Sequence, residues 1–537
     1  MTYPVRPALL GSLGAAFAAL LLFRLRKKKL APASAHNNNN NSNNSNNSNS
    51  NNSNNNNQSK KPVRLSRITT PELLEEDESE NYMNFYSMNE RAPRNFYSMN
   101  PMHVVREPVV IAMVGLPARG KSYMSKAIIR YLTFLGCPAR LFNAGSKRRD
   151  RGLEGADASF FDSGNADAKR QREKIAMDTL DELLEWLRSE TDGCACGIFD
   201  ATNTTVARRK AVMARCAQES PPVRLVFLES ICNDEIILQN NYQMKLGNDD
   251  YRGAEAAQAL QDFLQRVHEY EKVYEPITDE EAIPAATGHK NLKFRYLQTI
   301  NAGQKMVTAG CDGYIMSQLL PLLHSVHLGP RKVSIVLAGE SENDRQGFRG
   351  GDSCLSEAGL RYSRVVSRLM KQREATHQPA HVWTGSLQRY SQLTDMLCDT
   401  PRMVIKVKVL DELCFGSLEG LACGYMRHSL PEEHAKREAD KLHYRYPGAG
   451  GESYMDMVLR LRDCVQAFER VRRDVIVVCD VAVARALLGY FQGIPIAEIP
   501  DLEVSPGIIE LTRSHSGFQV SSLQVEEGDV SLLAKRH

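Results

Sequence analysis

The stretch "PVVIAMVGLPARGKS" (residues 108–122) decides the fold of the first half of the chain. Its apolar start is typical of a buried strand, and "KSYMSKAIIRYLTFLG" (121–136) has apolar residues at helical spacing. The loop between them matches G-x-x-x-x-G-K-[ST], a pattern whose backbone N–H groups surround a polyphosphate. Lys121 is expected to reach the β and γ phosphates, and the Ser122 hydroxyl to bind Mg²⁺. The predicted nucleotide-binding residues of the loop are Gly115, Leu116, Pro117, Ala118, Arg119, Gly120, Lys121 and Ser122.

Strand and helix patterns alternate on from this stretch. Strands are predicted at 139–143, 196–200 and 223–229, and helices at 166–190, 205–218 and 254–272. A second series has strands at 332–338, 380–384 and 474–480, with helices at 356–372, 387–398, 452–471 and 482–491. Such alternation predicts two α/β domains, each with a parallel sheet covered on both faces, that meet near residues 327–332. The length of 537 residues is too great for one core.

Composition excludes several classes of protein. The net charge of +3 is too small to indicate nucleic-acid binding. The 12 cysteines lack paired C-x-x-C spacing, which favours reduced thiols over a disulfide framework or a zinc site.

The N-terminal region is unlike the rest of the chain. Residues 7–23 are uncharged and precede "RLRKKK", so residues 1–30 are predicted to be a signal anchor that leaves the body of the protein in the cytoplasm. A cleaved or organelle-targeting segment, or a wrongly placed start codon, is the alternative. Residues 31–104 are predicted to be a disordered Asn/Ser-rich linker, and 526–537 a tail. The sequence "NFYSMN" occurs twice in the linker (84–89 and 95–100). The two copies are interpreted either as a docking peptide or as plain linker.

Polar residues after the predicted strands indicate the chemistry. Asp200 ends the strand in "GIFDATNTT", where a carboxylate suits a Mg²⁺-linked acid or a base for an acceptor hydroxyl. Guanidinium groups match phosphate oxygens in pairs, so arginines near strand ends predict an acceptor that already carries phosphate; plain solvated charge is the alternative. These arginines are Arg148, Arg149, Arg172, Arg208, Arg209 and Arg266.

Five segments together resemble one family. They are "VGLPARGKSYMSKAIIRYL", "FNAGSKRR", "IFDATNTT", "FLESIC" and "YRGAEAAQALQDFLQRVHEYEKVYEPI". Their order and spacing are similar to those of the 6-phosphofructo-2-kinase/fructose-2,6-bisphosphatase family, over about residues 105–515. The resemblance implies a P-loop, nucleoside-kinase-like domain at 105–328 and a histidine-phosphatase (phosphoglycerate-mutase-like) α/β domain at 329–525. It also implies a homodimer, and a product, fructose 2,6-bisphosphate, that regulates glycolysis.

The resemblance also implies roles for residues of the first domain. ATP and Mg²⁺ are expected at 115–122, at Asp200 and at the segment from Asn240 to Lys245. Lys121, Lys245 and Asp200 are the expected catalytic residues, with Asp200 in the acid/base role. The expected ligands of fructose 6-phosphate are Arg148, Arg172, Thr202, Arg208, Lys245, Arg266 and Tyr270. Cys232 matches a cysteine near the nucleotide, although a small buried residue is the simpler interpretation. Lys147 replaces a family tyrosine and is expected to add charge beside the sugar phosphate.

The second domain departs from the family in the stretch "SIVLAGESENDRQGFRGGDSCLS" (334–356). Histidine phosphatases carry Arg-His-Gly-Glu there, but the register fixed by "GGDS" puts Leu337 and Ala338 at the Arg and His positions. Phe348 replaces a further arginine, and the late Cys-His-Gln is Cys479, Asp480 and Val481. The retained residues are Arg389, Glu412, Arg437, Lys441 and Tyr446. With no imidazole nucleophile, and with Asp480 expected to repel phosphate, we predict an inactive phosphatase domain.

Three hypotheses follow. The leading one is a 6-phosphofructo-2-kinase that makes fructose 2,6-bisphosphate and does not hydrolyse it. The second is a bifunctional enzyme with an atypical nucleophile, for which Ser341 and Cys354 are the candidates although neither has an evident base beside it. The third is a catalytically silent sensor or scaffold that binds nucleotide and docks a partner.

Overall fold

The computed structural model describes residues 107–525, apart from 153–157, 163, 191–192, 247–254, 283–292, 328–330, 374–378, 399–401 and 515–516. The predicted anchor (1–30), linker (31–104) and tail (526–537) lie outside the described residues. Within the described ranges, none of the helices combines the length and the apolar composition that crossing a membrane requires.

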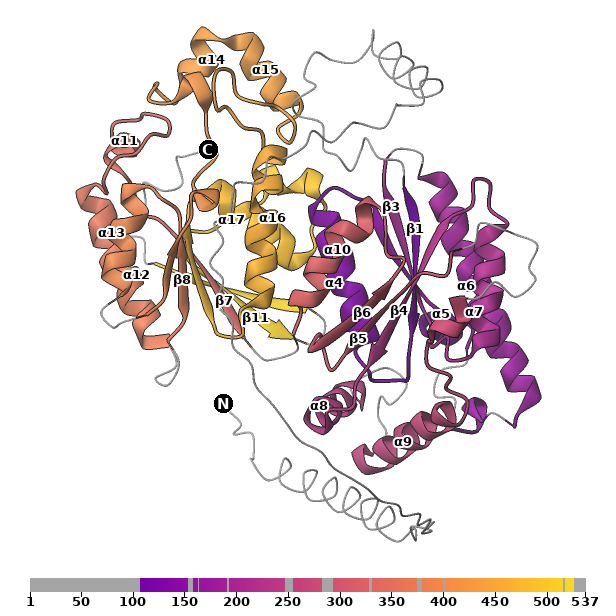
Figure 1. Ribbon diagram of the computed structural model, residues 1–537. Helices are drawn as coiled ribbons and strands as arrows, with labels where there is room; N and C mark the ends of the chain where they lie inside the picture. The colour runs from indigo at the N-terminus through magenta and orange to yellow at the C-terminus, as the bar shows by residue number, and fades with distance from the viewer. Residues whose placement is uncertain are drawn as a thin grey trace, which may run out of the picture. The chain divides into compact units, whose positions relative to one another are not determined.

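The first domain is built on a six-stranded sheet in the order β2-β3-β1-β4-β5-β6 (Figure 1). Its strands are β1 (Pro108–Val114), β2 (Ala139–Asn143), β3 (Ala195–Asp200), β4 (Arg224–Ile231), β5 (Tyr296–Ile300) and β6 (Lys305–Ala309). All neighbours pair in parallel except β6, which runs antiparallel to β5. Strands β1 and β3 are buried along nearly their whole length, as expected for a sheet with helices on both faces.

In the described part of this domain, seven helices accompany the sheet. They are α4 (Lys121–Phe134), α5 (Ala144–Asp150), α6 (Ala166–Ser189), α7 (Val206–Ala217), α8 (Glu235–Leu246), α9 (Ala256–Lys272) and α10 (Tyr314–Ser325). Helices α4, α5 and α7 follow directly on β1, β2 and β3, so they begin at the carboxyl edge of the sheet, where open α/β sheets bind ligands. The 3-10 turn η3 (Ala158–Phe161) precedes α6.

The second domain has its own six-stranded sheet, in the order β12-β11-β7-β10-β8-β9. Its strands are β7 (Lys332–Leu337), β8 (His381–Thr384), β9 (Val404–Lys406), β10 (Val475–Cys479), β11 (Gly507–Ser514) and β12 (Gly517–Gln524). Its helices are α11 (Glu342–Arg345), α12 (Glu357–Arg373), α13 (Gln388–Leu397), α14 (Tyr425–Ser429), α15 (Pro431–Ala439), α16 (Tyr454–Arg470) and α17 (Val481–Gln492). Strands β11 and β12 are antiparallel additions to a parallel core.

The predicted α/β class is confirmed for both domains, and the predicted strands and helices appear within about two residues of their expected ends. Both sheets have the predicted parallel core, and β6, β11 and β12 are antiparallel additions that the sequence patterns did not predict. These strands lie at or beside a sheet edge, and β12 is largely exposed, so they lack the continuous apolar run that marks a buried strand.

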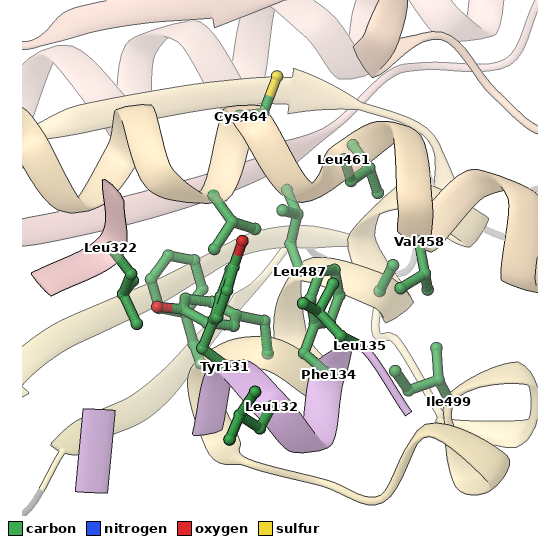
Figure 2. Packing of buried hydrophobic residues seen from close by; sticks show 14 of the residues in the cluster. Tyr131, Leu132, Phe134, Leu135, Leu322, Val458, Leu461, Cys464, Leu487 and Ile499 are labelled. Carbon is green, nitrogen blue, oxygen red and sulfur yellow. The ribbon is translucent and has the colours of Figure 1, made fainter. Parts of the chain in front are cut away.

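One hydrophobic cluster contains residues of both domains (Figure 2). Helix α4 of the first domain contributes Tyr131, Leu132 and Phe134, followed by Leu135, and all four are buried. They pack with residues from α16, α17 and the segment after α17. Those shown with them are Val458, Leu461, Cys464, Leu487 and Ile499. The two domains therefore share a core, in addition to the chain that joins them.

Candidate active site

The loop of residues 115–122 has a backbone that requires glycine. Gly115 has a φ of +130° and Gly120 a φ of +95°. A Cβ atom on Gly115 would lie 2.7 Å from the carbonyl oxygen of Ser230, so a larger residue does not fit. The Gly115 N–H donates to the Thr202 carbonyl (2.9 Å), which ties the loop to the segment after β3. Lys121 Nζ donates to the carbonyls of Gly115 (2.8 Å) and Leu116 (2.7 Å), so its ammonium lies against the loop.

The two predicted metal ligands lie side by side. Ser122 Oγ donates to Asp200 Oδ2 (3.1 Å), and Asn143 Nδ2 donates to the same oxygen (2.7 Å). Asp200 ends β3, next to β1, and is only 5% exposed. Among the residues that the structure describes, no group of three or more His, Cys, Asp or Glu side chains is placed to hold a metal ion. The pair fits Mg²⁺ all the same, because this ion takes one or two protein oxygens and completes its shell with phosphates and water.

Helices α8 and α9 contribute further side chains beside the loop of residues 115–122. Asn241 Nδ2 donates to the Ala118 carbonyl (2.9 Å), at a residue whose φ is +57°. Arg119 donates to Tyr242 Oη (3.0 Å), and the Tyr242 ring packs on Phe263.

The predicted nucleotide residue Asn240 is exposed, whereas its neighbour Asn241 is buried against the loop. Sequence reasoning missed Asn241 because two identical residues are adjacent, and only the rotation of α8 decides which one faces the loop. The side chain of Lys245 lies outside the described residues.

Four predicted substrate residues gather around η3. The Arg266 guanidinium lies 3.9 Å from the centre of the Phe161 ring, and that of Arg148 lies 5.6 Å from it. The Tyr270 ring packs on Phe161 at 5.9 Å between centres. Arg172 lies over the Phe160 ring and donates to the Phe160 carbonyl. These side chains come from α5, α6 and α9, so the fold brings together residues far apart in the chain.

The electrostatics of this cluster favour an anion. Burial lowers the pKa of Arg172 below its ordinary value, and the positive charges of Arg208 and Arg266 lower the pKa further, against the opposing influence of Tyr270 and Asp162. Arg208, on α7, makes a two-pronged ion pair with Glu173 of α6. A phosphate group beside these guanidiniums would relieve their mutual repulsion.

Two residues have ion-pair partners that their predicted roles did not include. Arg209 is fully buried and binds Glu281 (2.6 Å) and the carbonyls of Asn203 and Glu275, so the phosphate role predicted for it is wrong. Lys147 forms an ion pair with Glu182 (2.6 Å) on α6, which satisfies the charge that it was expected to add beside the sugar phosphate.

Arg149 donates to Ser146 Oγ (3.0 Å) within its own helix. Cys232 is buried, and burial raises the pKa of its thiol, which favours the simpler interpretation of a small buried residue.

In the second domain, the region expected to hold a phosphate is filled by protein groups. Leu337 and Ala338 are buried at the end of β7. The carboxylate of Asp480, at the N-cap of α17, forms a 2.5 Å ion pair with Arg389 of α13, and both side chains are 5% exposed or less. Tyr390 Oη donates to the same carboxylate (3.1 Å). Asp480 was expected to repel phosphate, and the ion pair with Arg389 weakens this repulsion because it offsets the charge of the carboxylate.

Other residues of this domain also have partners. Arg437 donates to Tyr446 Oη (2.9 Å), and Lys441 pairs with Asp501 (2.6 Å). Ser341, predicted to lack a base, lies 2.7 Å from a carboxylate oxygen of Asp344, but this pair forms a helix capping box and Ser341 is fully buried. The Ser341 hydroxyl is thus placed as a cap.

Glu412 lies close to the Asp480 carboxylate. It accepts hydrogen bonds from the backbone N–H groups of Leu413 (2.7 Å) and Ala482 (3.2 Å). Burial raises the pKa of Glu412 to about 7, and the negative charge of Asp480 contributes to the increase. A carboxyl group in this position gains or loses its proton near neutral pH.

Glu412→Gln is expected to remove a pH dependence of stability. The pKa of Glu412 is about 7 in the folded state, against an ordinary value of 4.5. The wild type should therefore lose stability relative to the variant as the pH rises from 4.5 to about 7, by on the order of 3 kcal/mol. Urea unfolding of both proteins from pH 4.5 to pH 8 measures the difference. Asp480→Asn removes the neighbouring charge and should move the window to lower pH; parallel curves for the wild type and Glu412→Gln would contradict the interpretation.

The comparisons agree with this architecture. The family model for 6-phosphofructo-2-kinase matches residues 98–330, and that for the histidine phosphatase superfamily (branch 1) matches residues 335–526. In structure, the alpha-ribazole phosphatase from Shigella flexneri aligns with 36% of this chain and 96% of its own, at 15% identity and a TM-score of 0.33. The two family models define a chain of two domains, a 6-phosphofructo-2-kinase domain followed by a histidine-phosphatase domain.

Curated relatives share most of the described region. "6-phosphofructo-2-kinase 1" of Saccharomyces cerevisiae is 38% identical over 419 residues, which cover 74% of this chain and 49% of the relative. "6-phosphofructo-2-kinase/fructose-2,6-bisphosphatase" of Caenorhabditis elegans is 36% identical, covering 79% of this chain and 91% of the relative. The chain spans about half the length of the yeast relative and most of the nematode one. It belongs to the 6-phosphofructo-2-kinase/fructose-2,6-bisphosphatase family, which confirms the resemblance seen in the sequence.

Proposed function

We propose that the chain transfers the γ-phosphoryl group of ATP to the 2-hydroxyl of fructose 6-phosphate, and that it does not hydrolyse the fructose 2,6-bisphosphate so formed. One observation carries the proposal: the Ser122–Asp200 pair lies where α4 begins and β3 ends, and α5 and α7, which carry Arg148 and Arg208, begin at the same edge of the sheet. Asn143, which binds Asp200, caps α5, and α5 carries Arg148. Thr202, whose carbonyl binds the P-loop, lies just before α7, which carries Arg208.

The residues of the chain supply positioning and charge. Residues 115–122 would hold the ATP phosphates, with the Lys121 ammonium against the β and γ groups. Ser122 and Asp200 would hold Mg²⁺, which neutralises phosphate charge when bound. Asp200 would also accept the proton of the attacking hydroxyl, and Lys245 would stabilise the transferred group. The proposed ligands of the sugar phosphate are Arg148, Arg172, Thr202, Arg208, Arg266 and Tyr270.

The second half of the proposal is the loss of bisphosphatase activity. Apolar side chains stand at the two positions where the resemblance puts the phosphate-binding Arg and the nucleophilic His, and both are buried. Arg389 is occupied by Asp480, so a phosphate would have to displace a buried carboxylate. Removal of a nucleophile lowers rates by up to about 10⁶-fold, which leaves no useful turnover.

The experiment uses the full chain with ATP labelled in its γ-phosphate and with fructose 6-phosphate. Labelled fructose 2,6-bisphosphate that persists after ATP is removed supports the proposal. Product that then decays to inorganic phosphate favours the bifunctional alternative, and the lack of any product favours the sensor or scaffold. The proposal includes a cytoplasmic homodimer, with anchoring through residues 7–23 tested by microscopy of the chain with and without that segment.

Arg172→Ala is expected to raise the KM for fructose 6-phosphate by about 10- to 100-fold, because hydrogen bonds to charged groups contribute about 1.5–3 kcal/mol. The KM for ATP should stay unchanged, since Arg172 belongs to the cluster around η3. Arg170→Ala is the matched control on the same helix, where the Arg170 side chain is 79% exposed and pairs with Asp167. Steady-state kinetics of the wild type, Arg172→Ala and Arg170→Ala measure the effect. Equal KM values for fructose 6-phosphate would show that Arg172 does not bind the sugar phosphate.

A further inference from the structure

Helix α4 has two ends with different surroundings. Its first residues, Lys121 and Ser122, belong to the P-loop. Its last turns are buried in the cluster shared with the phosphatase-like domain, where Figure 2 shows Phe134 and Leu135 beside Leu487 of α17. The ring of Phe134 also meets that of Tyr490, edge to face, at 5.5 Å between centres. One rigid element thus joins the proposed ATP site to the domain that is predicted to be inactive.

Polar contacts hold the same end of α4. Arg130 Nη2 donates to Glu469 Oε1 (2.7 Å), and Tyr490 Oη donates to the same oxygen (2.9 Å). The Arg130 guanidinium also lies 4.9 Å from the centre of the Tyr490 ring. The next residue of α4, Tyr131, accepts a hydrogen bond at its Oη from Gln466 of α16. Buried, directional contacts of this kind fix the rotation and the tilt of α4 as well as its depth.

The acceptor of these contacts is itself fixed. Glu469 Oε2 accepts from Arg331 (3.0 Å) and from Arg513 (2.6 Å), and all three side chains are almost completely buried. Arg331 also donates to the Phe468 and Val471 carbonyls, at the end of α16. Glu469 is therefore fixed by Arg331, which precedes β7, and by Arg513 of β11. These contacts keep Glu469 in place if α4 shifts.

We propose that the phosphatase-like domain is a positioning element of the kinase, which holds α4 so that Lys121 and Ser122 keep their places in the P-loop. This inference rests on the proposed function. Nine residues separate Lys121 from Arg130, or about 14 Å along the helix, so a small tilt at one end displaces the other. The arginine cluster rests on α5, α6, α7 and α9, whereas the shared core acts on α4. Loosening the core should consequently weaken ATP binding and leave fructose 6-phosphate binding unchanged.

Two leucines of the phosphatase-like domain provide a matched test. Leu487 of α17 belongs to the shared cluster, and Leu393 of α13 belongs to a second cluster whose buried members run from Val336 to Val525. Both side chains are fully buried, so truncation to alanine should lower the Tm of each variant comparably. We expect Leu487→Ala to raise the Kd for a fluorescent ATP analogue by about tenfold, because displacements of about 1 Å in a site have large effects. Leu393→Ala should leave that Kd unchanged.

The measurements are made on the full chain, at a temperature where the wild type and both variants are folded. The Kd for fructose 6-phosphate should be the same in all three proteins, and Leu487→Met, which keeps the volume, should restore the affinity for nucleotide. Equal nucleotide affinity in Leu487→Ala and Leu393→Ala, or a parallel loss of affinity for both ligands, would overturn the inference. A wild type that binds the nucleotide analogue but makes no fructose 2,6-bisphosphate would instead refute the proposed function.

Discussion

Lys121→Ala is expected to lower the rate of fructose 2,6-bisphosphate formation by at least 10²- to 10³-fold. Removing one preorganised donor from a site where negative charge develops has roughly this effect in other enzymes. The Lys121 ammonium is nearly buried and held by two carbonyls of the loop, so the position of the proposed phosphate donor is already restricted. Initial rates of product formation at saturating ATP and fructose 6-phosphate measure the loss.

The control for this variant is Lys126→Ala. Lys126 lies on the same helix and is exposed, so its removal should change neither the rate nor the Tm. Lys121→Ala should also keep its Tm within a few degrees of the wild type, which separates a catalytic effect from a folding one. Near-normal turnover by Lys121→Ala would reject the assignment of this loop to the ATP phosphates.

Glu469→Gln should give the largest loss of stability, about 3–5 kcal/mol at pH 7. The variant leaves the guanidiniums of Arg130, Arg331 and Arg513 buried around a neutral side chain, and removal of one partner from a buried ionic group is strongly destabilising. Urea unfolding measures the free energy. Glu510→Gln is the control, because its partners Arg373 and Lys332 are 42% and 32% exposed, and we expect a loss of about 1 kcal/mol or less.

The pH dependence gives a second measure of the same residue. Burial opposes the ionisation of Glu469, but the three arginines outweigh it and lower the pKa to about 2, from an ordinary value of 4.5. The stabilisation by the charged group is therefore fully present above pH 4.5 and is lost as the pH falls toward 2. The difference between the wild type and Glu469→Gln should shrink across this range. A difference in unfolding free energy that stays constant from pH 5 to pH 2 would show that the charge of Glu469 does not stabilise its contacts with the three arginines.

The proposed kinase site was largely predictable from the sequence. The P-loop, Asp200 and the arginines near the carboxyl ends of strands follow from short motifs and from the alternation of strand and helix patterns, because local periodicity is set by residues close together in the chain. The absence of an imidazole at Ala338 and Asp480 was equally visible. Asn241 was not, since the choice between two adjacent asparagines depends on how α8 packs on the loop.

Ion pairs between residues far apart in the chain explain why the predicted roles of some charged residues differ from what the structure shows. Lys147 was expected to add charge beside the sugar phosphate and Arg209 to bind phosphate, but acidic residues 35 and 72 positions further on, Glu182 and Glu281, pair with them in the fold. Asp480 was expected to face and repel phosphate, but the structure pairs it with Arg389, 91 positions earlier. No pattern within one helix or strand specifies these pairings, because each depends on how two elements pack.

The sequence by itself determined the two α/β domains and the glycine-rich loop motif, and it predicted the loss of the phosphatase nucleophile, since these depend on which residue types stand at which spacing. Only the tertiary structure decided that helix α4 carries the nucleotide loop at one end and is held by the second domain at the other. The contact that joins them, Arg130 with Glu469, spans 339 residues of chain. Its energy comes from opposite charges and hydrogen bonds that meet, in a buried place, only after both domains have folded.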